Sequence, residues 1–154
     1  MFRTPRTLFR TFAFAEVVSW TLLIAGLILR ATMGLDIATT IGGTIHGFIF
    51  ISYGATAILV SKNNRWAPGP TIVAVISAVI PYATIPMEIW LNRTGRLNGQ
   101  WRREETGDPR ERAWHDRLLR ALLRRPVLFG LAILAAVIVV FAVALIIGPP
   151  GGRH

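Results

Sequence analysis

The sequence contains no cysteine, which excludes a disulfide framework, a thiolate metal site and a catalytic cysteine. Acidic residues are also scarce, with eight against seventeen basic residues, and only one of the basic residues is a lysine. This arginine bias is a compositional hint of a GC-rich bacterial genome. The net charge of +9 raises the possibility of nucleic-acid binding, but the basic residues flank apolar runs. Anionic lipid headgroups are therefore the expected partner, and nucleic acid is not.

Charge is missing altogether from long stretches, although the chain has a mean hydropathy of +0.50 and 16% charged residues. A soluble domain of this length would carry more charge and distribute it more evenly. Four apolar segments stand out: Thr11–Leu29, Ile37–Val60, Thr71–Leu91 and Val127–Ile147. At about 1.5 Å per residue, each segment is close in length to the ~30 Å hydrocarbon thickness. Lipid offers no hydrogen-bond partners, so a single segment within it must be a helix, which satisfies its own backbone groups. The predicted fold is an all-α, multi-pass integral membrane bundle with three core transmembrane helices and a fourth C-terminal span.

The first apolar segment imitates a secretory signal, because arginines precede it. It is longer than an ordinary signal core, and no small-x-small cleavage site follows it. We therefore interpret it as an uncleaved transmembrane helix of a bacterial plasma (inner) membrane protein.

The segment Asn92–Pro126 holds ten arginines and separates the third and fourth apolar runs. Asp108 suits a helix N-cap, with Pro109 at the first helical position and Glu111 completing a capping box. An apolar stripe is then expected at Trp114, Leu118 and Leu122. The arginines on the other side are predicted to contact lipid headgroups: Arg110, Arg117, Arg120 and Arg124. The alternative is a soluble amphipathic helix that docks on a partner protein.

The distribution of basic residues is compatible with more than one orientation in the membrane. Three arginines precede the first segment and only Arg30 follows it, which favours a cytoplasmic N-terminus. Four full crossings would then place the arginine-rich loop outside. Either the N-terminus is outside, or the third segment does not cross. Its "IPYATIP" stretch has two prolines, Pro81 and Pro86, and each removes a backbone donor. A re-entrant turn there would keep every large basic cluster on one side.

The candidate functional residues are the polar side chains within the apolar runs. A charge at the centre of a membrane helix costs roughly 2.5–3.5 kcal/mol on insertion scales, so such residues usually face the bundle interior and have a partner. The predicted intramembrane polar site is formed by Glu16, Ser19, His46, Tyr53 and Glu88. Of these, Glu88 is expected near the interface, where Arg93 could pair with it.

Three glycines in the second segment form a small face, Gly43, Gly47 and Gly54, and they predict close helix packing. His46 lies beside this face, so a hydrogen bond between Glu16 and His46 is plausible, although Glu16 is nearer the start of its helix. The pair could form a polar lock that fixes helix register, or a proton relay in a small cavity. A metal or haem ligand role for His46 is the weakest option, because no second histidine is near. No metal and no cofactor are predicted.

An ordered set of motifs resembles a known family. Glu16 and Ser19 come first, then "LR" at Leu29–Arg30, "HG" at His46–Gly47, Tyr53 and Trp66. "SAVIPYAT" at Ser77–Thr84 follows, with Glu88 just beyond and Ala83 where the family tends to have glycine. From about Thr7 to Arg96, the chain resembles a group of small bacterial integral membrane proteins known as domain of unknown function 3817. The resemblance implies a compact three-helix membrane domain but does not indicate which activity, if any, the domain has.

The predicted organisation has three parts: a membrane domain at 7–96, a basic interfacial segment at 97–126 and a C-terminal span with its tail at 127–154. No GxSxG, HExxH, P-loop or dinucleotide fingerprint occurs, so an enzyme is not expected. The leading hypothesis is a non-enzymatic membrane module, an accessory subunit or assembly partner. It would bind lipid and a partner membrane protein, or form a homo-oligomer. The alternative is a small oligomeric transporter or proton-coupled carrier that uses Glu16 and His46.

Overall fold

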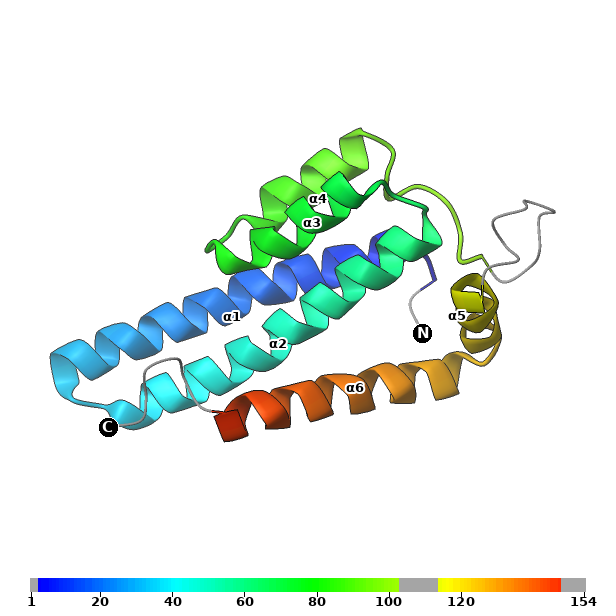
Figure 1. Ribbon diagram of the computed structural model, residues 1–154. Helices are drawn as coiled ribbons and strands as arrows, with labels where there is room; N and C mark the ends of the chain where they lie inside the picture. Colours follow the sequence, from blue (N-terminus) through cyan, green and yellow to red (C-terminus); the bar gives the residue numbers. More distant parts are fainter. Residues whose placement is uncertain (1–2, 103–113, 148–154) are drawn as a thin grey trace.

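The structure, a computed structural model, describes residues 3–102 and 114–147. Within these ranges the regular elements are helices and no strand occurs, in agreement with the predicted all-α class (Figure 1). The elements are α1 (Pro5–Met33), α2 (Asp36–Asn63), α3 (Pro68–Ile76), the 3₁₀ turn η1 (Ser77–Val79), α4 (Thr84–Arg93), α5 (Trp114–Arg124) and α6 (Pro126–Ile147).

Helices α1 and α2 form a long antiparallel pair, and both are long and apolar enough to cross a membrane (Figure 1). The Thr4 side chain caps α1 by accepting a hydrogen bond from the Thr7 backbone, and Pro5 occupies the first helical position. The helix ends because Gly34 takes a left-handed conformation, with φ 68° and ψ 20°. α2 then begins at Asp36, whose carboxylate favours a helix N-terminus and lies 2.8 Å from Arg30 Nε.

The closest approach of α1 and α2 is made by two glycines, Gly26 and Gly42. A Cβ atom on Gly26 would stand 2.6 Å from the Ala38 carbonyl oxygen, and one on Gly42 would stand 2.7 Å from that of Leu22. The predicted packing face at Gly43, Gly47 and Gly54 is therefore misplaced for this pair. Of those three, Gly47 lies against Phe141 of α6, whereas Gly43 has only one distant contact and Gly54 faces open space.

The third apolar segment is not one continuous helix, so three core spans are not confirmed. α3 ends at Ile76 and η1 at Val79, the chain turns through Ile80–Ala83, and α4 runs back in the opposite direction, with α3 against α2 and α4 against α1 (Figure 1). Pro81 stands in the turn, and the sharp bend is made by Tyr82 at φ 66° instead of by Ala83. Pro86 is the third residue of α4, where its missing N–H has no partner to lose. The predicted proline break is thus real, and it produces a helical hairpin.

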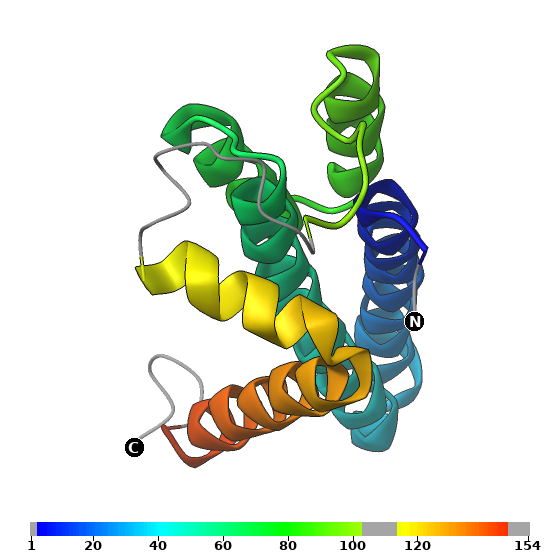
Figure 2. The ribbon, with the colours of Figure 1, turned by 90° about the vertical axis from the view of Figure 1, so that its right-hand side faces the viewer.

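The hairpin α3–α4 and helix α6 lie on opposite sides of the α1–α2 pair, and α5 runs across the end of the molecule (Figures 1 and 2). α6 runs antiparallel to α2 (Figure 1). The rings of Phe48 and Phe141 meet edge to face, with their centroids 6.2 Å apart. On α5, Leu118 of the predicted apolar stripe is half exposed, as a lipid-facing side chain would be, and Leu123 is the buried leucine. Arg120 is also buried, unlike Arg117 and Arg124, which are exposed as a headgroup contact requires. Asp108 and Arg110 lie outside the described residues.

One end of the molecule gathers nearly all of the positive charge. The start of α1, the end of α2, the open end of the hairpin and α5 meet there (Figure 1). The basic residues at this end are Arg3, Arg6, Arg10, Lys62, Arg65, Arg93, Arg96, Arg102, Arg117, Arg120, Arg124 and Arg125. At the opposite end, the only basic side chain in the described ranges is Arg30, which is paired with Asp36. We call the first of these the basic end.

Aromatic and amide side chains close the basic end. Phe9 is fully buried, with its ring centroid 5.5 Å from that of Tyr53 and 6.0 Å from that of Trp66. Trp66 Nε1 donates to the Arg96 carbonyl, and the Asn63 side chain donates to the Gln100 carbonyl. These bonds hold the segment after α4 against the end of α2.

The glycine contact leads to a prediction about stability. Gly42→Ala places a methyl group against the Leu22 carbonyl, so the free energy of unfolding in detergent should fall by about 1–3 kcal/mol. The matched control is Gly54→Ala, whose methyl group meets open space and which should be neutral or stabilising by up to about 1 kcal/mol. Equal effects of the two substitutions in SDS or thermal unfolding would show that the close approach at Gly42 is wrong.

Candidate functional site

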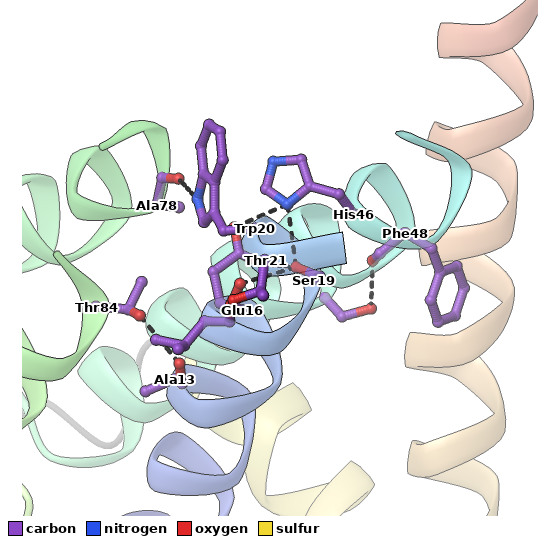
Figure 3. A network of polar contacts seen from close by, with 11 residues as sticks. Ala13, Glu16, Ser19, Trp20, Thr21, His46, Phe48, Ala78 and Thr84 are labelled. Atoms are coloured by element: carbon purple, nitrogen blue, oxygen red, sulfur yellow. Dashed lines mark hydrogen bonds and ion pairs between the residues drawn. The ribbon is translucent and has the colours of Figure 1, made fainter. Parts of the chain in front are cut away.

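A polar cluster joins α1 and α2 within their apolar lengths (Figure 3). Ser19 Oγ lies 3.0 Å from His46 Nδ1 and 3.3 Å from Glu16 Oε2, and His46 Nδ1 lies 3.8 Å from Glu16 Oε1. Glu16 is completely buried, and the His46 side chain is 12% exposed. Because 3.8 Å is too long for a hydrogen bond, Glu16 and His46 are bridged by the Ser19 hydroxyl.

The number of protons in this cluster restricts its hydrogen bonding. The Ser19 hydroxyl has one proton and three acceptors within reach: the Glu16 backbone carbonyl at 2.9 Å, the Glu16 carboxyl and His46 Nδ1. Both protons are used when His46 Nδ1–H donates to Ser19 Oγ and the Ser19 hydroxyl donates onward to Glu16. The arrangement therefore forms a directional chain from α2 to α1.

The cluster extends to the hairpin through Trp20. The indole ring of Trp20 lies 4.3 Å from the His46 ring, centroid to centroid, and its Nε1 donates to the Ala78 carbonyl at 3.1 Å (Figure 3). Ala78 belongs to η1, where the break in the helix leaves carbonyl groups without the usual helical partner. Trp20 thus satisfies a backbone acceptor that the hairpin turn exposes.

Two further hydrogen bonds hold the tip of the hairpin. The Tyr53 hydroxyl lies 3.0 Å from Ser77 Oγ, and both side chains are buried. Thr84 Oγ1 donates to the Ala13 carbonyl at 3.0 Å (Figure 3). The tip is therefore bonded to α1 and to α2. Ser77 and Thr84 were not among the predicted site residues, although they begin and end the motif "SAVIPYAT".

Glu88 does not join the cluster. It lies on α4 one turn beyond Thr84, and no hydrogen bond or ion pair links it to Glu16 or His46 in the described ranges. Its side chain is only 6% exposed, so the predicted interfacial pairing with Arg93 is wrong for this buried position. One oxygen of Glu88 and Glu16 Oε1 are buried without a hydrogen-bond partner among the described residues.

The cluster has the chemistry of a structural hydrogen-bond network or of a short proton path. Among residues 3–102 and 114–147, no group of three His, Asp or Glu side chains is placed to hold a metal ion. The Ser19 oxygen lies within hydrogen-bond reach of an imidazole, as in a serine nucleophile activated by a base, but Ser19 is buried between the helices and 1% exposed.

Comparison with known proteins identifies the family. The model of the Domain of unknown function (DUF3817) matches residues 6–93, which include α1, α2 and the hairpin. The chain belongs to this family. A proposed membrane protein of Streptomyces coelicolor is 38% identical over 103 residues, which is 66% of this chain but only 12% of that protein's length. The chain thus matches a small part of a much longer relative, and no solved structure matches it. Together with the two long apolar helices, these relationships indicate that this chain is a membrane protein of a family whose function is unknown.

The bridging hydroxyl of Ser19 gives a direct test of the cluster. Ser19→Ala removes the link between Glu16 and His46, and it should lower the free energy of unfolding in detergent by about 0.6–2 kcal/mol. Thr32→Ala is the matched control, because the exposed Thr32 hydroxyl bonds only to the Ile28 carbonyl of its own helix. The control should change stability by less than about 0.5 kcal/mol. If the two variants unfold alike, the cluster does not stabilise the helix pair.

Proposed function

We propose that this chain is a non-enzymatic membrane module, an accessory subunit or assembly partner, in which the polar cluster acts as a lock between helices. The observation that carries the proposal is the long relative, in which the matching part is 12% of the protein. A domain that occurs within a larger membrane protein is suited to work in contact with other membrane-embedded parts. Its extensive exposed apolar surface agrees with contacts to lipid and to a partner.

The proposed topology has three crossings, α1, α2 and α6, with the hairpin α3–α4 entering and leaving on the same side. α6 has 22 residues and no charged side chain, which is enough to span the hydrocarbon. The basic end would then face the cytoplasm of a bacterial inner membrane, as the positive-inside rule requires. This arrangement removes the conflict in the sequence, because every large basic cluster falls on one side.

A role for the cluster as a lock is supported by what its bonds connect. The Ser19–His46 bond joins α1 to α2, and the Trp20–Ala78 bond joins α1 to the hairpin. Polar contacts between membrane helices fix their register and orientation. Residues that hold three elements in place fit a module whose purpose is to present a defined surface.

A proton-coupled carrier is the second candidate, and one observation favours it. Glu16 Oε1 is buried without a hydrogen-bond partner in the described ranges, 3.8 Å from an imidazole nitrogen. Buried carboxyl and histidine side chains recur in the proton relays of transporters. A carrier of this kind would move protons without any other protein.

Reconstitution separates the two candidates. The purified chain is placed in lipid vesicles with a pH gradient and an internal pH-sensitive dye, and the vesicles are compared with protein-free ones. A module that acts only in an assembly should give no proton flux above the protein-free rate, and Glu16→Gln should change nothing. Asp36→Asn serves as the control for loss of an exposed carboxyl. A proton flux that Glu16→Gln lowers tenfold or more, and that Asp36→Asn leaves unchanged, would contradict the module proposal and support the carrier.

A further inference from the structure

A groove lies between α6 and the α1–α2 pair. Helix α6 is on the side of the pair away from the hairpin (Figures 1 and 2). Its volume is about 720 Å³. Side chains from all three helices line it, including Phe12, Phe48, Thr56, Gly130 and Val137, and Trp101 closes it near the basic end. The Ser52 hydroxyl also lies in the wall but donates to the Phe48 carbonyl of its own helix, which leaves the wall largely apolar.

The length of the groove matches one leaflet of a bilayer. Along α2 the lining extends from Phe48 to Leu59, and along α6 from Val127 to Val137. At about 1.5 Å per residue, these stretches are about 15–17 Å long, close to half of the ~30 Å hydrocarbon thickness. The groove therefore runs from the basic end to about the middle of the membrane, as an acyl chain of that leaflet does.

The mouth of the groove carries positive charge. Arg124 and Arg125 directly precede α6, both are exposed, and Val127 of the groove wall follows two residues later. On the other side of the mouth, Trp101 is followed by Arg102, which donates to the backbone carbonyls of Lys62 and Asn63 and so fixes that wall. No acidic residue is among the lining residues. A negative headgroup above an apolar chain complements this arrangement.

We propose that the groove binds an anionic phospholipid, with one acyl chain between α6 and the α1–α2 pair and the phosphate beside Arg124 and Arg125. The proposal rests on the topology given above only in that α6 lies in the membrane. It does not depend on whether the polar cluster is a lock or a proton path, so it can fail or succeed separately from the proposed function. The bound lipid would connect α6 to the family domain at residues 6–93.

The test is native mass spectrometry of the full chain in detergent with three probes: phosphatidylglycerol, phosphatidylcholine with the same acyl chains, and glycerol phosphate. Each arginine near a membrane surface strengthens anionic lipid binding about fivefold, so phosphatidylglycerol should bind far more tightly than phosphatidylcholine. Arg124→Gln and Arg125→Gln should each reduce this preference about fivefold. Glycerol phosphate, which has no chain, should not bind measurably.

A matched pair of glycine variants tests the position of the chain. Gly130 lines the groove and an added Cβ meets open space there, so Gly130→Leu should fill the groove without displacing protein atoms. Gly54 also faces open space but is outside the groove, which makes Gly54→Leu the control. Gly130→Leu should lose bound phosphatidylglycerol at least tenfold, whereas Gly54→Leu should bind it as the wild type does. Circular dichroism checks that both variants remain folded.

Four results would overturn the proposal. One is equal lipid binding by Gly130→Leu and Gly54→Leu. Another is equal affinity of the wild type for phosphatidylglycerol and phosphatidylcholine. The third is tight binding of glycerol phosphate, which would indicate a site for a free phosphate group. The last is a dimer that Gly130→Leu abolishes, which would make a second copy of the chain the occupant of the groove.

Discussion

The structure depends on one constraint: backbone groups within a membrane need partners from the protein, because hydrocarbon offers none. Two long helices meet this requirement by themselves, but the turn between α3 and α4 does not. The Ala78 carbonyl at this turn accepts a hydrogen bond from the Trp20 indole. The Ser77 hydroxyl is hydrogen-bonded to the Tyr53 hydroxyl. Thr84 in turn donates to the Ala13 carbonyl. These three bonds hold the tip of the hairpin against α1 and α2.

The polar cluster and the glycine contact join α1 to α2 at different places along the two helices. Gly26 and Gly42 bring the two backbones together at the end of the pair opposite the basic end, where the helices pack without side chains between them. Farther along, the helices leave room for larger groups, and the Glu16–Ser19–His46 chain occupies part of that space. Phe9, Tyr53 and Trp66 fill the remainder toward the basic end. A change at either contact should therefore alter the position of the hairpin as well as that of α1 and α2.

Sequence patterns predicted the all-α class, the presence of the two long apolar helices and the proline break, because these follow from local composition. They also brought Glu16 and His46 into one neighbourhood, although not the Ser19 bridge between them. The sequence patterns failed where the environment of a residue depends on which other helix packs against it. The face at Gly43 and Gly47 is one residue, or about 100° of helix rotation, away from the contact that Gly42 makes. In the same way, the sequence showed that Glu88 is acidic and near the end of an apolar run, but it could not show that α4 folds back and buries it.

The central claim is that the hairpin enters and leaves on the same side, held at its tip by α1 and α2. Site-directed labelling tests it directly, because the chain has no cysteine of its own. Single cysteines at Lys62, Leu35 and Asn98, all exposed, report on the end of α2, the α1–α2 turn and the segment after α4. The account predicts that an impermeant maleimide reaches Lys62→Cys and Asn98→Cys from one face of the membrane and Leu35→Cys from the other. Labelling of Lys62→Cys and Asn98→Cys from opposite faces would contradict it.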